Sequence, residues 1–313
     1  MDHLAGGSTA STRFLRDMWQ GTKPKSEVVA NADNELKELK GPDFFALQLA
    51  IGRYFTHSKQ DTDSIRALKY LEGASTLDPA EFEPHLEILR FATHKDHRMP
   101  ELMREQAGIC LSMRPDIAAM WVWKGIVIRE YDTSDPDRLP KSRKCFEKAI
   151  ELDPSREDAH LFVGMVYYDL QKTELAEKAF DLAASLPSIN PERRGEISTF
   201  RGLVRATLGK WKLAREDYEI AAKDKFVQSD APFQYNLACT VSLMSASVSR
   251  DESLSETDRT RLGRELKTAA IQHAADAIRL GFNKPEHLKM FKTDKDFEPI
   301  RSEPEFQSLF RDK

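Results

Sequence analysis

Cysteine is scarce in this chain. Three of the 313 residues are cysteine, Cys110, Cys145 and Cys239, and they lie far apart in the sequence. An odd number of widely spaced cysteines builds no disulfide framework and lacks the close pairing of zinc ligands. We interpret all three as buried thiols of a protein in a reducing compartment.

Long apolar runs and an excess of one charge are missing as well. No run of about 18 apolar residues occurs, and the N-terminus lacks the apolar stretch of a signal peptide. The 47 lysine and arginine residues nearly balance 51 aspartate and glutamate residues, for a net charge of -4. No positive field over the whole chain therefore attracts nucleic acid or an anionic membrane. We expect a soluble cytoplasmic protein with neither kind of partner and no membrane insertion.

Sequence patterns of known reaction centres are also absent. The chain has no glycine-rich phosphate loop, no nucleophile elbow and no His-Glu-x-x-His helix. His94 and His97 have the spacing nearest to a ligand pair, but no further ligand is held rigidly beside them, so we predict a solvated turn. Glu101 and Glu105 have the spacing of ordinary surface carboxylates on a helix. We therefore predict no enzyme, no catalytic residue, no metal and no cofactor.

What the chain does contain is a helical pattern that repeats about every 37 residues. A small or apolar residue recurs at intervals of 37, 36, 39, 38 and 36, at Gly52, Leu89, Gly125, Gly164, Gly202 and Ala238. Prolines close several of these units, at Pro79, Pro115, Pro154 and, less regularly, Pro191. With 40% apolar and 31% charged residues, the chain can bury an interior that is spread along a stack of helices.

The clearest unit is 158–187. Its residues follow the spacing W-x2-L-G-x2-Y…A-x3-F-x2-A, with His160 at the tryptophan position and Val163, Gly164, Tyr167, Ala176, Phe180 and Ala183 after it. This unit resembles the tetratricopeptide repeat family. The resemblance implies an all-α protein, a right-handed α-solenoid of about six helix pairs. Gly164 would let the paired helices approach closely, and Phe180 would fill the gap between repeats.

The resemblance covers about 45–310 and divides the chain into three parts. We expect a flexible tether over 1–42 with a short amphipathic helix near 11–20, a repeat array over 43–281, and a C-terminal cap over 282–313. The cap resembles the segment that closes many bacterial tetratricopeptide arrays, where it covers the last helix. The expected helix pairs span about 45–79, 82–115, 118–154, 157–190, 195–228 and 231–281, with a long loop over 131–140 and an insertion over 245–264.

Three hypotheses remain open for the helix near 11–20. Phe14, Leu15, Met18 and Trp19 share one face, and such a face must be buried somewhere. The helix packs on the first repeat, or it docks a partner, or it belongs to an organelle presequence. Acidic residues such as Asp17 oppose the presequence hypothesis.

The resemblance also predicts where a partner binds. The family builds its concave groove mainly from the first helix of each pair. The residues that this places in the groove are Arg53, Arg90, Val122, Leu161, Phe162, Met165, Tyr168, Phe200, Leu203, Tyr235 and Asn236. Apolar and aromatic side chains there would hold a peptide or an amphipathic helix, and the two arginines would bind acidic residues. The alternative for each residue is packing against a neighbouring helix.

A protein–protein interaction adaptor or scaffold is the function that these features predict, with a partner peptide or helix in the concave groove. The alternative is a structural subunit that is permanently assembled into a larger complex through its loops and N-terminal tether. Asn236 also matches one position of the carboxylate clamp found in chaperone-binding members of the family. The other clamp residues are missing from this chain, so we do not predict that activity.

Overall fold

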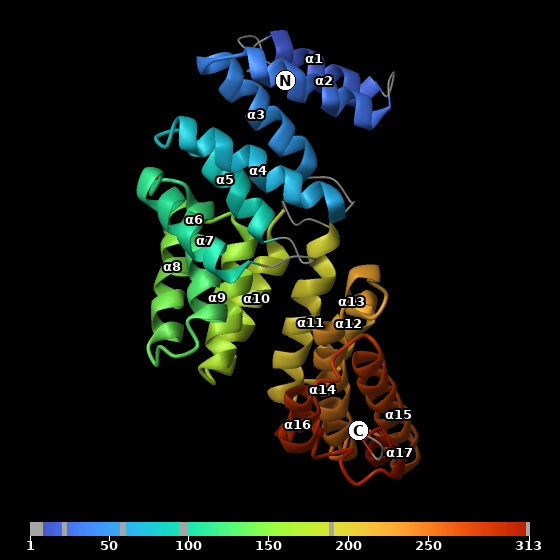
Figure 1. Cartoon of the computed structure of the whole chain (residues 1–313). Helices are drawn as coiled ribbons and strands as arrows, with labels where there is room; N and C mark the ends of the chain where they lie inside the picture. The colour runs from blue at the N-terminus through green and yellow to red at the C-terminus, as the bar shows by residue number, and fades with distance from the viewer. Residues whose placement is uncertain (1–8, 21–23, 57–60, 94–98, 188–190, 311–313) are drawn as a thin grey trace. The chain divides into compact units, whose positions relative to one another are not determined.

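The computed structural model describes residues 9–20, 24–56, 61–93, 99–187 and 191–310. Every regular element in these ranges is helical, with seventeen α-helices, one short 3₁₀ helix and no strand (Figure 1). The prediction of an all-α protein is confirmed. The turn expected around His94 and His97 lies outside the described residues. Among the described helices, none is both long enough and apolar enough to cross a bilayer.

The chain forms two compact units, residues 1–138 and 139–313. In the first unit, α3 packs on α4, α4 on α5, α5 on α6 and α6 on α7. This sequential packing is the pattern of a solenoid. The helices of this unit are α1 (Thr9–Gln20), α2 (Lys25–Glu38), α3 (Gly41–Thr56), α4 (Asp61–Leu77), α5 (Phe82–Ala92), α6 (Pro100–Met113) and α7 (Ala118–Tyr131).

Two helices precede the first expected repeat. Helix α1 packs on α3, and the buried Phe14 meets the edge of Tyr54 at 6.0 Å between ring centroids. Leu15 and Met18 of α1 pack against the same core, so these three apolar side chains are covered by the chain itself. Helix α2 was not predicted, because its short apolar stripe, Val28, Val29 and Ala32, lies among polar residues and is buried only through tertiary contacts. Segments 1–8 and 21–23 of the expected tether lie outside the described residues.

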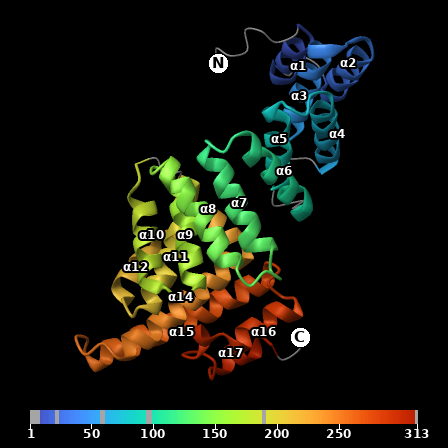
Figure 2. The same ribbon diagram turned by 90° about the vertical axis from the view of Figure 1, so that its left-hand side faces the viewer.

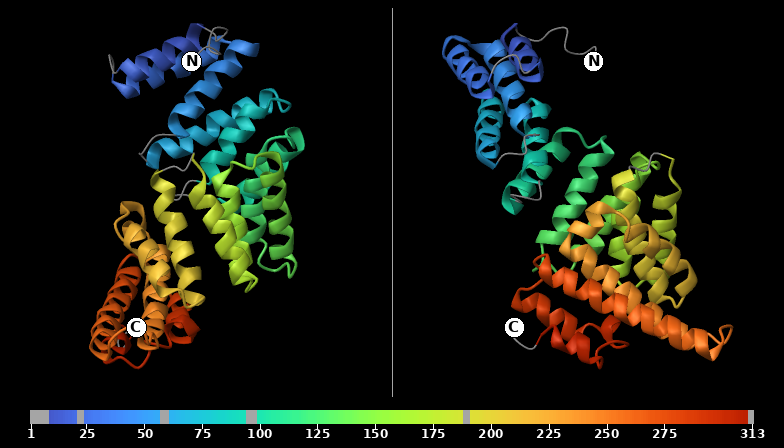
Figure 3. Two further views of the ribbon diagram at one scale, coloured as in Figure 1. Left: turned by 180° about the vertical axis from the view of Figure 1, so that it is seen from behind. Right: turned by 90° about the vertical axis from the view of Figure 1, so that its right-hand side faces the viewer.

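The second unit continues the sequential packing from α9 to α12 and then through α14 and α15. Helix α15 is its longest helix and runs along α14 (Figures 2 and 3). The elements are α8 (Arg138–Leu152), α9 (Glu157–Asp169), α10 (Thr173–Ser185), α11 (Pro191–Thr207), α12 (Trp211–Ala221), α13 (Lys225–Ser229), α14 (Ala231–Ser249), α15 (Glu256–Arg279), α16 (Pro285–Thr293), the 3₁₀ helix η2 (Lys295–Phe297) and α17 (Pro304–Ser308).

Small residues bring α9 and α10 together. A Cβ atom added at Gly164 would lie 2.7 Å from the Phe180 ring, closer than any side chain tolerates. Ala176, Phe180 and Ala183 are completely buried in the same core. The repeat spacing therefore reflects the close approach of two helices, with the phenylalanine filling the space above the glycine.

Both predicted loops are shorter than expected. Over 245–264, α14 continues to Ser249 and α15 begins at Glu256, so most of the expected insertion is helical. The polar residues of this segment form the start of α15 and the solvated face of the helix. At the start, the Ser255 hydroxyl accepts a hydrogen bond from the Asp258 N–H at 3.1 Å. Likewise, α8 begins at Arg138, inside the loop expected over 131–140.

Candidate partner-binding surface

In the first unit, the predicted groove residues Arg53 and Arg90 meet at one buried acid. Glu87 is 2% exposed, and its Oε1 atom accepts hydrogen bonds from Arg53 Nε at 3.3 Å and from Arg90 Nη1 at 2.9 Å. Glu83 also pairs with Arg53. Two arginines and two glutamates make a neutral cluster, so an acidic partner would have to compete with Glu83 and Glu87. Val122 is buried and offers no surface to a partner.

In the second unit, three predicted groove residues are buried. Leu161 lies in the core that α9 shares with α10 and α11. Leu203 and Tyr235 lie in a core with residues from the end of the chain. These three side chains therefore pack against neighbouring helices, as the alternative hypothesis for each residue states, and they offer no surface to a partner.

The C-terminal segment 282–310 covers Tyr235. Phe282, Phe291 and Phe297 surround its ring at centroid distances of 4.9, 4.9 and 5.4 Å. The Tyr235 hydroxyl donates to Asp294 Oδ2 at 2.6 Å. The expected cap thus lies against the side of α14 that was predicted to hold a partner. The sequence signal for this contact is the set of phenylalanines in the segment, which have to be buried against something.

The same segment reaches further along this side of the unit. The Ser242 hydroxyl of α14 donates to the main-chain oxygen of Asp296 at 2.6 Å. The half-buried Tyr168 of α9 lies against the same core, and the Asp296 carboxylate is close enough to raise the pKa of its hydroxyl, after burial as the main cause. Tyr168, which was predicted to face a partner, therefore faces the chain's own C-terminal segment.

Four predicted residues of the second unit stay half-buried with part of their surface exposed. They are Phe162 and Met165 on α9, Phe200 on α11 and Asn236 on α14, and we call them the partner surface. Helix α11 contacts both α9 and α14, so these helices are neighbours. The partner surface is the part of the predicted groove that remains accessible in this unit.

Stacking contacts fix both rings of the partner surface. Phe162 stacks on Phe146 with 5.5 Å between centroids and 16° between planes. Phe200 stacks on Phe180 at 6.1 Å and 16°, and it meets the edge of Phe233 at 5.8 Å. Rings that are already held in place lose little conformational entropy when a partner covers them.

A carboxylate precedes each of these rings by one helical turn. Asp158 lies four residues before Phe162, and Glu196 lies four residues before Phe200, which places each acid on the same helix face as its ring. Burial raises the pKa of Glu196, and nearby carboxylates add to this effect while Arg193 opposes it. The repeated acid-x3-Phe pattern is present in the sequence but was not singled out there.

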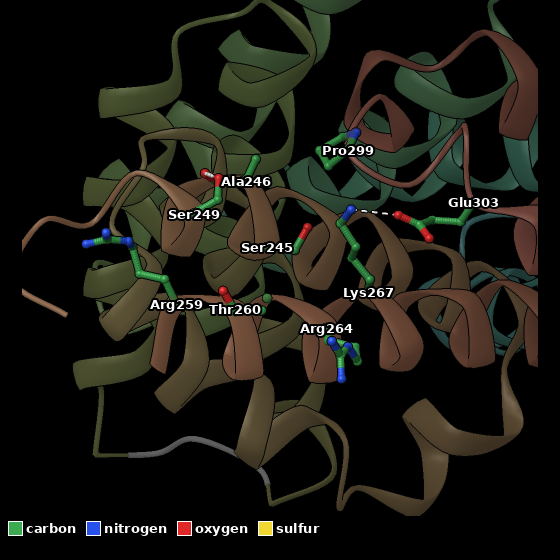
Figure 4. Close-up of a pocket in the computed structure, with 10 residues that line it drawn as sticks. Ser245, Ala246, Ser249, Arg259, Thr260, Arg264, Lys267, Pro299 and Glu303 are labelled. Atoms are coloured by element: carbon green, nitrogen blue, oxygen red, sulfur yellow. Dashed lines mark hydrogen bonds and ion pairs between the residues drawn. The ribbon is translucent and has the colours of Figure 1, made fainter. Parts of the chain in front are cut away.

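A cavity of about 440 Å³ lies elsewhere in the second unit, between α14, α15 and the C-terminal segment (Figure 4). Lys267 in this cavity pairs with Glu303 at 2.6 Å. Arg259 and Arg264 point away from Ser245, and Arg259 donates to the Leu254 main-chain oxygen at 2.8 Å. The cationic groups do not converge on one point, so the cavity lacks the arrangement of a built anion site or reaction centre.

Comparison with known proteins identifies the fold. No family model matches the sequence, and no curated protein matches it. A solved tetratricopeptide repeat protein from Parabacteroides merdae aligns over 91% of this chain and 98% of its own, with a TM-score of 0.58 and 14% identity. This chain has the tetratricopeptide repeat fold.

Two further tetratricopeptide-like neighbours support the same assignment of an all-α solenoid. PilW, a type IV pilus biogenesis factor, aligns over 81% of this chain and 100% of its own, with a TM-score of 0.54 and 14% identity. PilF of Pseudomonas aeruginosa aligns over 85% and 100%, with a TM-score of 0.52 and 14% identity. At this level of identity, the neighbours share the tetratricopeptide fold with this chain and nothing more specific.

Proposed function

We propose that this protein is an interaction scaffold that binds a short partner segment on the partner surface. The observation that carries the proposal is the pair of partly exposed, stacked rings, Phe162 and Phe200, on adjacent first helices of two repeats. Aromatic side chains contribute most of the binding energy where a partner covers them. Repeat solenoids use such extended faces for recognition.

The charges beside the rings define the partner more closely. Asp158 and Glu196 carry negative charge next to the apolar side chains. Arg156 pairs with Asp158, and Arg193 pairs with Glu196. The two arginines balance the negative charge only in part, because two further acids, Glu157 and Asp230, are also close to Glu196. We therefore expect a segment with apolar residues and at least one lysine or arginine. Asn236 offers an amide donor and acceptor to the backbone of that segment.

Selection of displayed random peptides on the full chain tests the proposal. We expect apolar peptides that contain a basic residue, and we expect the double change Phe162→Ala and Phe200→Ala to weaken their binding at least about tenfold, since each anchor contributes 1 kcal/mol or more. Leu182→Ala is the matched control, because Leu182 is 53% exposed on the outer helix α10. Fluorescence anisotropy of a labelled peptide measures both affinities.

Two results would contradict the proposal. Peptides that bind the double variant as tightly as the wild type would move recognition to another face of the chain. Failure to select any peptide, together with aggregation of the purified full chain, would favour the structural subunit of a larger complex instead.

A further inference from the structure

The C-terminal segment brings two carboxylates together beside the core of the second unit. Asp294 and Asp296 flank the start of η2, and both side chains are half-buried. One carboxylate oxygen of each and the Sγ atom of the buried Cys239 all lie within 4.8 Å of one another. Two like charges at this separation repel each other strongly where water is excluded.

Uncharged groups face this pair from two helices of the second unit. Tyr235 and Cys239 face it from α14, and Tyr168 faces it from α9. Arg301 donates to the main-chain oxygen of Asp294, not to its carboxylate. Within the described part of the chain, no lysine, arginine or histidine forms an ion pair with either carboxylate.

A half-buried carboxylate pair that no cation neutralises relieves its repulsion by keeping one proton. Burial, followed by the charge of Asp294, raises the pKa of Asp296 from 3.8 to about 6, while the hydrogen bond from Tyr168 opposes the shift. The side chains of Tyr168 and Tyr235 belong to first helices of two repeats, so the protonation of this pair affects how the segment sits against those helices.

We propose that the Asp294–Asp296 pair is a proton-dependent latch, which holds segment 282–310 more tightly against α9 and α14 when the pair carries one proton than when both groups are ionised. The latch rests on the geometry of the second unit and does not depend on the proposed partner surface. Because the shift is upward, the seated segment binds the proton more tightly than the released segment does. Its seating is therefore strongest at low pH and weakens as the pH rises through about 6.

Hydrogen exchange of the full chain, corrected for intrinsic exchange rates, measures the seating directly. We expect backbone amides of 282–310 to be protected about tenfold more at pH 5.0 than at pH 7.5. This ratio follows if the pKa of Asp296 is 3.8 in the released segment and about 6 in the seated segment. Asp296→Asn should give high protection at both pH values. Asp294→Asn, which removes the repelling charge, should reduce the ratio.

Two matched variants separate the latch from other titrations in the segment. Glu298→Gln removes an exposed acid two residues from Asp296 and should leave the tenfold ratio unchanged. His287→Gln changes a residue whose ring stacks on Phe282 with 4.0 Å between centroids, and it should also leave the ratio unchanged.

Several results would overturn the latch. One is a ratio of amide protection at pH 5.0 to protection at pH 7.5 that is below about twofold in the wild type. Another is the loss of this pH dependence in Glu298→Gln or His287→Gln. A change in protection at pH 7.5 on adding a chelator would assign a bound cation to the pair in place of a proton. If Asp296→Asn fails to fold, a carboxyl carbon NMR titration of the wild type decides, because an Asp296 midpoint near 3.8 contradicts the latch.

Discussion

The ring of Phe180 packs directly over Gly164, and this contact sets the spacing of α9 and α10. We predict that Gly164→Ala destabilises the protein by about 1–3 kcal/mol, because the added methyl group forces the buried ring to move. Gly263→Ala is the control, since an added Cβ there meets no atom within 4 Å and alanine favours the helix. Urea denaturation of the two variants should give changes of opposite sign. Equal destabilisation would show that the contact with Phe180 is unimportant.

The second prediction at the scale of residues concerns the negative charge of Glu196 beside the partner surface. Glu196→Gln should weaken a selected lysine-containing peptide by about threefold to tenfold at low ionic strength, and the difference should shrink in high salt. Glu174→Gln on α10 removes an exposed acid from the outer helix and should have no effect. Anisotropy titrations at two salt concentrations give the comparison. Unchanged binding in Glu196→Gln would remove the basic residue from the description of the partner.

At the scale of elements, the start of α15 shows how a helix was mistaken for a loop. Serine, aspartate and glutamate are frequent both in loops and at the first turn of a helix, and composition alone does not distinguish the two. Ser255, followed by Glu256 and Asp258, is the signature of a helix start. Helix α2 was missed for a different reason, because its apolar stripe is short and depends on contacts with the rest of the first unit.

The cap of α15 can be tested by itself. Ser255→Ala should lower the free energy of unfolding by about 1 kcal/mol, because the Asp258 N–H loses its acceptor. Thr257→Ala, at an exposed position of the same first turn, should change stability by no more than about 0.5 kcal/mol. Thermal unfolding followed by circular dichroism compares them. A larger loss in Thr257→Ala would contradict the role assigned to Ser255.

For the whole molecule, the repeat spacing was sufficient to predict the fold class. Residues such as Gly52, Gly164 and Phe180 stand at repeat positions for a local reason, since the two helices of a pair must approach closely. Such contacts join residues that are close together in the sequence. Which part of the predicted groove stays accessible depends on the contact between the C-terminal segment and α14, and the repeat spacing does not predict this contact. Tyr235 and Phe297 are far apart in sequence, and only the folded second unit shows that the C-terminal segment covers the inner side of α14.

The sequence therefore predicted a set of groove helices but not which of their side chains stay partly exposed in the folded chain. Leu161, Leu203 and Tyr235 have the same repeat positions as exposed groove residues in the family pattern, yet they are buried in this chain. Phe162 and Phe200 remain partly exposed, although they stack on the neighbouring rings of Phe146 and Phe180. The central claim is that these two rings hold a partner segment.

Photo-cross-linking tests this claim most directly. A photoreactive phenylalanine analogue replaces Phe162 in the full chain, or Leu182 on the outer helix α10 as the control, and each protein is irradiated with a selected peptide. The account predicts a cross-link from position 162 and none from position 182, with the cross-linked site next to a basic residue of the peptide. Cross-linking from position 182 alone would contradict it.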